Sequence, residues 1–190
     1  SSIGSDATYY WCAQNNDGVD TSSWTQMANF ILDTAVATPS SFSPASASTI
    51  TDTTPTITFT TNENADCRAS LLDDSYDLAS DDVNCTGDGT TSQTCQMGDL
   101  GSDGAKSVYV ACQDTAGNKD SNSTNEDLSY TLDVTAPTTS DDYGAKDNVW
   151  QNSNQTITLT PADATSGVLW TKYCADSDNT CNPQVGTQYS

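Results

Sequence analysis

The sequence contains no histidine and few cations. Five Lys and Arg residues stand against 26 Asp and Glu residues, which gives a net charge of −21. Proteins that bind the phosphates of nucleic acids need clustered cations, so the composition excludes nucleic acid as a partner. Without histidine there is neither a Ser–His–Asp nor a Cys–His arrangement, and no carboxylate stands out as a general acid or base. We therefore expect a protein that is not an enzyme.

Long apolar runs and glutamate are scarce as well. No run reaches the length of about 18 apolar residues that a membrane span requires. Only Glu63 and Glu126 are glutamates, and the other acids are aspartates, which favour turns. With 34% apolar residues, each folded unit is expected to have a thin core between two packed sheets. Ser1 does not begin a signal peptide, so we expect a mature chain or a part of one.

Seven cysteines are present, and no two of them form a Cys-x-x-Cys pair. With no histidine beside them, this pattern argues against zinc and indicates disulfides. Disulfides persist in oxidising surroundings, so we expect an extracellular protein. The odd number leaves one sulfur without a partner inside the chain.

The clearest positive signal is a pair of strands that occurs twice, at an offset of 100 residues. Residues 107–137 contain two stretches of alternating apolar and polar residues, joined by a turn and followed by a proline. Residues 9–39 repeat this pattern. The matching pairs are Cys12 and Cys112, Phe30 and Tyr130, Leu32 and Leu132, and Asp33 and Asp133; residues 156–160 likewise repeat 56–60. A repeat of this length indicates small domains in series.

We predict three parts. Residues 1–39 are the C-terminal half of a domain, with strands near 8–13 and 27–32. Residues 40–136 are a complete domain. Residues 137–190 are the N-terminal half of another domain, with strands at 156–160 and 169–174. In the complete domain, strands are expected at 56–61 and 67–72, followed by an Asp-rich loop over 73–99.

The two half-domains together contain 93 residues, close to the 97 of the complete domain. Read end to start, Ser190 followed by Ser1 forms an ordinary loop that enters a strand. The expected partner is therefore the protein itself, in a head-to-tail homopolymer. Either the 190 residues are one period of a longer chain, or separate subunits donate strands to a neighbour's open sandwich. The alternative is an arbitrary fragment with disordered ends.

Three stretches carry a resemblance to a known family: Val108–Asn118, Asp133–Pro137 and Trp150–Thr160. They resemble the tandem immunoglobulin-like (Ig-like) repeats of bacterial and archaeal surface proteins and adhesins. The resemblance covers essentially the whole chain and implies an all-β fold of tandem Ig-like sandwiches. Such repeats form stalks, adhesin shafts and filaments, so the resemblance does not specify a ligand.

The resemblance also suggests how the cysteines pair. Cys67 and Cys112 lie on the expected third and sixth strands, which are neighbours in an Ig-type sheet, and Cys85 with Cys95 then closes the acidic loop. Four cysteines allow three pairings, so the alternatives stay open. Cys174 and Cys181 are expected to clamp a hairpin. Cys12 remains free or pairs with Cys174 of the preceding unit. The antibody-type bridge is absent, because residues 56–61 contain no cysteine.

Aspartates in turns and at domain ends suggest a calcium site. Those expected to converge near the junctions between domains are Asp17, Asp33, Asp114, Asp120 and Asp133. Calcium prefers several hard oxygen ligands in flexible geometry, and calcium between domains stiffens similar adhesin repeats. The sequence has no EF-hand spacing. Solvated acidic turns on a highly charged surface are the alternative.

Three sequons, at Asn84, Asn122 and Asn154, predict N-glycosylation of a surface. Trp11, Trp24, Trp150 and Trp170 are either core residues or platforms for sugars. Two function hypotheses follow. The first is a structural unit of an extracellular filament or stalk. The second is an adhesin module that binds glycans or receptors on other cells.

Overall fold

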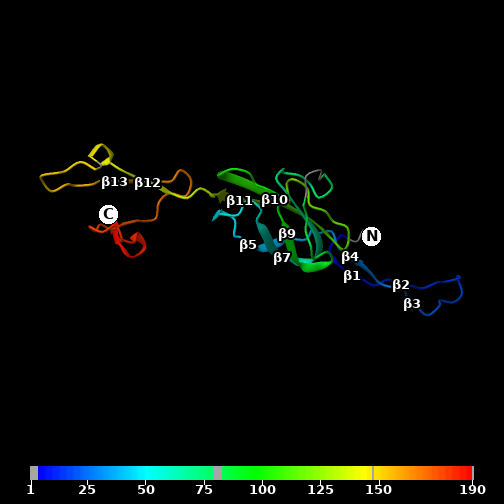
Figure 1. The fold of residues 1–190 in the computed structure, drawn as a ribbon. Coiled ribbons are helices and arrows are strands. Elements are labelled where there is room, and N and C mark those ends of the chain that lie inside the picture. The colour runs from blue at the N-terminus through cyan, green and yellow to red at the C-terminus, as the bar shows by residue number, and fades with distance from the viewer. Residues whose placement is uncertain (1–3, 79–82, 147, 190) are drawn as a thin grey trace. The chain divides into compact units, whose positions relative to one another are not determined.

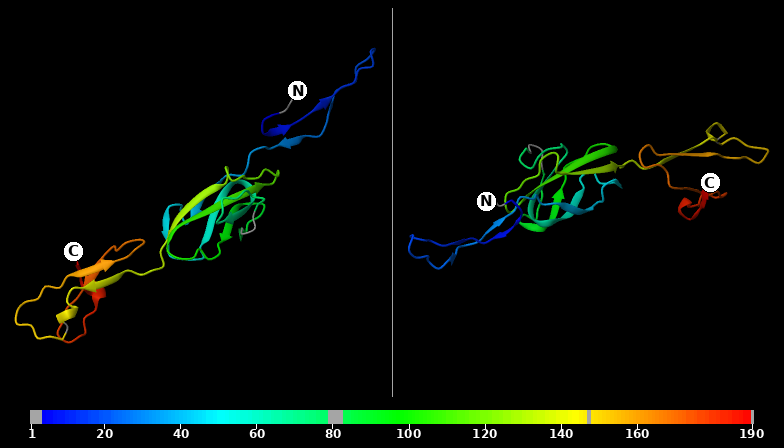
Figure 2. Two further views of the ribbon diagram at one scale, coloured as in Figure 1. Left: turned by 90° about the horizontal axis from the view of Figure 1, so that it is seen from above. Right: turned by 180° about the vertical axis from the view of Figure 1, so that it is seen from behind.

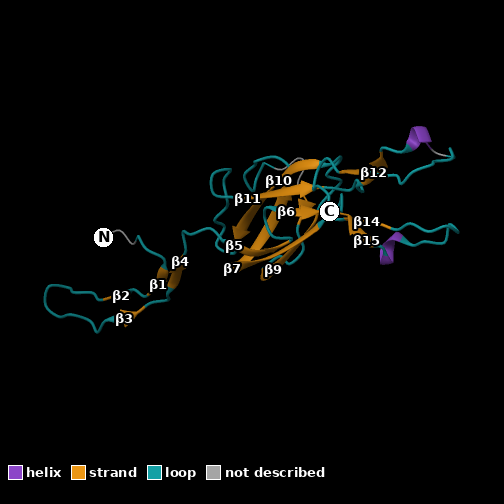
Figure 3. Cartoon of the chain, turned by 90° about the vertical axis from the view of Figure 1, so that its left-hand side faces the viewer, coloured by secondary structure: helices purple, strands orange, loops and turns teal. Residues whose placement is uncertain are grey.

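The structure is a computed structural model that describes residues 4–78, 83–146 and 148–189. Within these ranges the regular elements are strands, apart from two short 3-10 helices, Gly144–Lys146 and Pro183–Val185. The chain is therefore all-β, as the alternation of apolar and polar residues predicts; in Figure 3 the helices are short purple turns and the other regular elements are orange strands. Among the described residues, no helix has the length and apolar character needed to cross a bilayer.

The chain forms two compact units, which are described separately. The first contains Ser1–Ser46, Thr54–Gly98 and Ser107–Ser129. The second contains Ala47–Thr53, Asp99–Lys106 and Tyr130–Ser190. The predicted boundaries after residues 39 and 136 stay a prediction, and the predicted junction of Ser190 with Ser1 lies outside the described residues. The names opening segment (residues 4–39), middle segment (40–136) and closing segment (137–189) are used below.

The middle segment contains a seven-stranded sheet that curls (Figures 1 and 2). Its main path runs β5–β7–β10–β11–β6, and β8 and β9 also pair with β7. The strand β7 pairs antiparallel with β5, β8, β9 and β10, whereas β6 pairs with β11 in parallel. The strands are β5 (Pro39–Ser43), β6 (Ser48–Ile50), β7 (Thr56–Ser70), β8 (Val83–Asn84), β9 (Thr90–Gln96), β10 (Gly104–Asp114) and β11 (Glu126–Leu132).

The prediction of separate strands at 56–61 and 67–72 was wrong, because β7 is one strand of 15 residues. Its odd-numbered side chains from Ile57 to Ala69 are buried, except for the half-buried Glu63. The polar run 62–64 hides this alternation in the sequence. The pairing of β7 with β9 shifts its register between Thr60 and Ala65, which absorbs that run within the strand.

The Asp-rich stretch 73–99 is not wholly a loop, since it contains β8 and β9. On β9 the side chains of Gln93 and Cys95 are buried. The Gln93 amide donates hydrogen bonds to the carbonyls of Ala65 (2.9 Å), Gly87 (3.0 Å) and Thr90 (2.9 Å). A buried glutamine with these partners belongs to a sheet, although its polarity predicts a loop.

The opening and closing segments contain only two-stranded sheets. The strands in these segments are shorter than predicted and lie at shifted positions. The predicted ranges are 8–13, 27–32, 156–160 and 169–174. In the opening segment, β1 (Ala7–Tyr9) pairs with β4 (Phe30–Leu32), and β2 (Cys12–Ala13) with β3 (Thr25–Gln26). In the closing segment, β12 (Thr138–Asp141) pairs with β13 (Leu159–Ala162), and β14 (Thr171–Tyr173) with β15 (Thr187–Tyr189).

Candidate assembly surfaces and acidic cluster

The strand pairs β5–β7 and β12–β13 match at two consecutive residue pairs at an offset of 100 residues, before the register of β5–β7 shifts between Ser40 and Ser43. Ser40 pairs with Thr60, and Ser140 pairs with Thr160. The side-chain contact is shared as well: the serine hydroxyl donates to the threonine carbonyl at 3.4 Å in the first pair and 3.5 Å in the second. Equal spacing in the sequence therefore corresponds to equal local structure.

A turn recurs at the same offset. The backbone N–H of Ala35 donates to the carboxylate of Asp33 at 3.3 Å, and that of Thr135 donates to Asp133 at 3.2 Å. An aspartate that accepts from the backbone two residues later forms an Asx turn, which redirects the chain after a strand. The two aspartates thus form matching turns after β4 and β11.

Matching positions differ sharply in burial. Ile57 in the middle segment is 0% exposed, whereas Ile157 in the closing segment is 50% exposed. Ile50 is 7% exposed, but its counterpart Trp150 is 101% exposed. Tyr130 is 3% exposed, but Phe30 in the opening segment is 44% exposed. Side chains that form the core of the middle segment therefore have uncovered counterparts in both outer segments.

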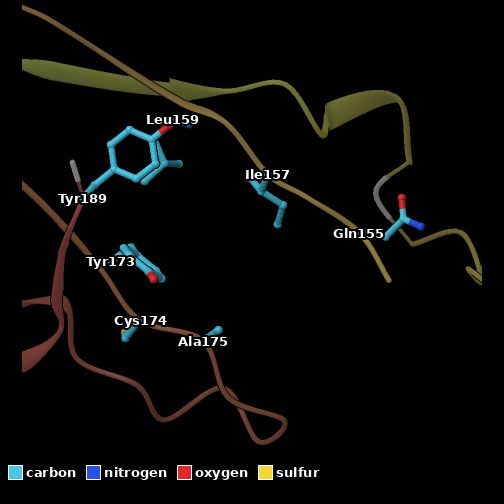
Figure 4. A pocket seen from close by; sticks show the side chains of 7 residues that line it. All are labelled: Gln155, Ile157, Leu159, Tyr173, Cys174, Ala175 and Tyr189. Carbon is cyan, nitrogen blue, oxygen red and sulfur yellow. Dashed lines mark hydrogen bonds between the residues drawn. The ribbon is translucent and has the colours of Figure 1, made fainter. Parts of the chain in front are cut away.

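The closing segment has an apolar hollow of about 360 Å³. Its walls are lined by Gln155, Ile157, Leu159, Tyr173, Cys174, Ala175 and Tyr189 (Figure 4). The ring of Tyr189 packs edge-on against Tyr173 at 6.4 Å, and its hydroxyl accepts a hydrogen bond from the Leu159 backbone N–H at 3.2 Å. Ile157 and Leu159 lie 100 residues after Ile57 and Phe59, which are both buried. The hollow is thus the counterpart of a filled core.

The opening segment presents an apolar face on its β1–β4 hairpin. Tyr9 lies opposite Phe30 in the register, and their rings stack at 5.5 Å. Leu32 projects on the same side as Phe30, because alternate residues of a strand share a face. Ile31 projects on the other side and is exposed. The face formed by Tyr9, Phe30 and Leu32 is called the hairpin face below.

The structure contains the three disulfides that the sequence analysis expects. They are Cys67–Cys112, Cys85–Cys95 and Cys174–Cys181. Cys12 is exposed and has a free thiol. Three disulfides are typical of a protein that folds in an oxidising compartment, which suggests a secreted or extracellular protein.

The predicted calcium ligands do not gather in one place. Among the described residues, the group that brings carboxylates within 4.8 Å of one another is Asp33, Glu63 and Asp114. Asp114 is buried and accepts hydrogen bonds from Gly117 N–H (2.7 Å), Asn118 N–H (2.9 Å) and the Asn118 amide (2.7 Å). The same Asn118 amide donates to the Asp33 carbonyl at 3.2 Å. This acidic cluster contains two of the five predicted residues.

The other three predicted residues lie elsewhere. Asp17 caps its own turn by accepting from the N–H groups of Val19 and Asp20. Asp120 is buried and accepts from the Cys112 N–H at 2.9 Å. In the second unit, the Ser166 N–H donates to the carboxylates of both Asp133 (3.1 Å) and Asp163 (3.0 Å). Of the aspartates expected to converge near the junctions, Asp33 and Asp114 therefore meet, whereas local turn and backbone hydrogen bonds hold Asp17 and Asp120 apart from them.

Sequence reasoning missed Glu63 in the cluster, although a signal was present. Glu63 and Asp163 are separated by the repeat offset, as are Asp33 and Asp133, so an acidic pair recurs. Burial, followed by repulsion from Asp33 and Asp114, raises the pKa of Glu63. Several hard oxygens this close together suit a cation such as Ca²⁺, and without a cation the charges repel one another.

The predicted surface residues are exposed. Asn84, Asn122 and Asn154 all face solvent, as attachment of a glycan to a sequon requires. The four tryptophans, Trp11, Trp24, Trp150 and Trp170, are each more than half exposed. Their exposure is consistent with either an uncovered core or a ligand platform.

No family model and no curated protein matches this chain. A solved structure that is similar is that of CopC from Methylosinus trichosporium OB3b, with 12% identity over 51% of this chain and 93% of that chain. The TM-score is 0.37, which is too low to support an argument about this protein.

Proposed function

We propose that this chain is a structural unit of an extracellular filament or stalk, built head to tail from Ig-like β-sandwich domains. The closing segment of one copy and the opening segment of the next form one domain, and the middle segment forms the other. The observation that carries the proposal is the burial contrast. Positions that are core in the middle segment are uncovered in both outer segments, at Ile157, Trp150 and Phe30.

The opening and closing segments match different parts of the middle segment. The closing segment holds the counterparts of positions in β5 and β7, and two of its residue pairs, Thr139–Pro161 and Ser140–Thr160, match the register of β5 with β7. Within this sequence, the counterparts of positions 107–133 occur only in the opening segment. Covering these apolar side chains provides a favourable free energy of about 25 cal/mol per Å² of apolar surface removed from water. Isolated two-stranded hairpins are marginal in water, so both segments gain from association.

Sedimentation velocity of the purified protein over a range of concentrations tests this function. The expected result is a ladder of species larger than 20.0 kDa that grows with concentration and ionic strength. Salt is expected to favour assembly, because two copies with a net charge of −21 repel each other. A single 20.0 kDa species under all conditions would contradict the proposal.

A second candidate function, glycan binding by an adhesin, has support at Trp24. Trp24 is 63% exposed, and its counterpart at the repeat offset is the exposed Thr124. An incomplete domain therefore explains the exposure of Trp150, whose counterpart is buried, but not the exposure of Trp24. Exposed aromatic rings stack on sugars, so a glycan array that compares the wild type with Trp24→Ala tests this function. Trp150→Ala is the matched control, and equal binding by the wild type and Trp24→Ala would remove the candidate.

A further inference from the structure

We propose that the apolar hollow of the closing segment receives the hairpin face of a second copy. Ile157, Leu159, Tyr173 and Tyr189 form the receiving surface, and Tyr9, Phe30 and Leu32 form the inserted one. This inference rests on the proposed function and specifies the interface through which copies join.

The receiving surface is unfilled in a single copy. Ile157 is 50% exposed and Tyr173 is 44% exposed, although both line a hollow that is mainly apolar. Tyr189 is held by its ring contact with Tyr173 and by its hydrogen bond to the backbone of Leu159, so the wall is formed before a partner arrives. A preformed apolar recess of this kind fits an aromatic or aliphatic side chain.

The middle segment indicates what covers such a surface. There the counterparts of Ile157 and Leu159, which are Ile57 and Phe59, are fully covered. The residues buried in the same segment include Tyr130 and Leu132, at 3% and 0% exposure. Their counterparts at the repeat offset are Phe30 and Leu32, on β4 of the opening segment. Because both sets of positions are buried in the middle segment, we assign the β1–β4 hairpin, through Phe30 and Leu32, as the occupant.

The proposed contact joins two different surfaces, so between copies it is heterologous. Each copy carries one receiving surface and one inserted surface, so joining two copies leaves one of each free at the ends. Such a heterologous contact propagates into a line unless its rotation closes a ring. This is the geometry that a head-to-tail filament requires.

Charged substitutions in the full chain test the interface from both sides. Phe30→Asp disables the inserted surface, and Ile157→Asp disables the receiving surface, since each buries an unpaired charge on docking. Ile31→Asp, on the opposite side of β4, and Thr160→Asp, at an exposed position of β13, are the matched controls. In sedimentation velocity, we expect Phe30→Asp alone and Ile157→Asp alone to be monomers and both controls to assemble as the wild type does.

An equimolar mixture of Phe30→Asp and Ile157→Asp is the decisive sample. It retains one intact surface of each kind, so we expect dimers and nothing larger. Dimer formation also shows that neither variant is merely misfolded. Wild-type-like assembly of either variant alone, or a mixture that stays monomeric while the wild type assembles, would overturn this interface but leave the filament proposal standing. A wild type that never assembles would overturn both.

Discussion

Cys67 and Cys112 lie directly opposite each other on β7 and β10, and a disulfide of 2.03 Å joins their sulfurs. The bond closes a sequence separation of 45 residues, whereas Cys174–Cys181 closes only 7. A disulfide that closes a longer loop removes more conformational entropy from the unfolded chain. Replacing both Cys67 and Cys112 by Ser is therefore expected to lower the free energy of unfolding by about 2–5 kcal/mol. Guanidinium unfolding of this variant measures the cost. The Cys174→Ser, Cys181→Ser double variant is the comparison, and equal or greater loss there would contradict the expectation.

Asp120 is a buried carboxylate with one partnered and one unpartnered oxygen. The first accepts from the Cys112 N–H, and the second has no hydrogen bond. Burial raises the pKa of Asp120 above its ordinary value of 3.8. Because the pKa of Asp120 is higher in the folded state, the protonated carboxyl contributes stability. This contribution is complete below pH 3.8 and is lost as the pH rises through the pKa of the folded state.

We therefore expect Asp120→Asn to unfold at a higher temperature than the wild type at pH 7, because the amide keeps an acceptor and removes the charge. The gain is expected to shrink as the pH falls toward 3.8. Thermal unfolding across this range measures it, with the exposed Asp127→Asn as control. A gain that is equal at all pH values would refute the explanation.

Tyr76 connects the carboxylate of Asp66 with the cations of Arg68 and Lys119. Its hydroxyl donates to Asp66 at 2.6 Å, and the guanidinium of Arg68 lies 4.6 Å from its ring centre. Burial and Asp66 raise the pKa of Tyr76 to about 12. The stability that the protonated Tyr76 hydroxyl gives to the fold is therefore complete below pH 10.0 and is lost as the pH rises to about 12.

Ultraviolet titration of the tyrosinate absorbance tests this relation. Burial raises the pKa of two of the eight tyrosines, Tyr76 and Tyr130, so both are expected to ionise late. The ionisation at about pH 12 should be missing in Tyr76→Phe. The variant also removes the partner of the half-buried Asp66 carboxylate, at an expected cost of about 1–3 kcal/mol. An unchanged late step in Tyr76→Phe would assign it to another residue.

The acidic cluster gives a prediction about cations. Burial, with Asp33 and Asp114 nearby, raises the pKa of Glu63 in the folded state. The stability that protonated Glu63 contributes is therefore lost as the pH rises through this raised pKa. Without added metal, Glu63→Gln is expected to be more stable than the wild type at pH 7. Added Ca²⁺ is expected to raise the unfolding temperature of the wild type more than that of the variant. Equal calcium shifts in both proteins would remove the cluster as the cause.

The all-β class and the repeat offset were readable from the sequence because alternation and spacing are local signals. The length of β7 was not, since the polar run 62–64 interrupts the apolar pattern while the strand continues. The strand β9 was hidden for a related reason: the side-chain N–H groups of buried Gln93 donate to three carbonyls that are distant in sequence or in a turn. Such partners are set by the fold, so propensity alone misses them.

The site was predicted less completely than the fold class. Asp33 and Asp114 meet, but Asp17 and Asp120 are held by nearby backbone N–H groups, which no spacing rule reveals. Glu63 joins the cluster through the pairing of β7 with its neighbours. The hollow at Ile157 exists because a side chain at a core position is left uncovered. The sequence indicated this only through the repeat, in which Ile157 matches Ile57.

Electron cryomicroscopy of the assembled protein tests the central claim most directly. The account predicts linear particles in which the hairpin face of one copy, with Phe30 at its centre, covers Ile157 and Tyr173 of the next copy. A particle in which those side chains stay bare, or in which each chain's own hairpin covers them, would contradict it.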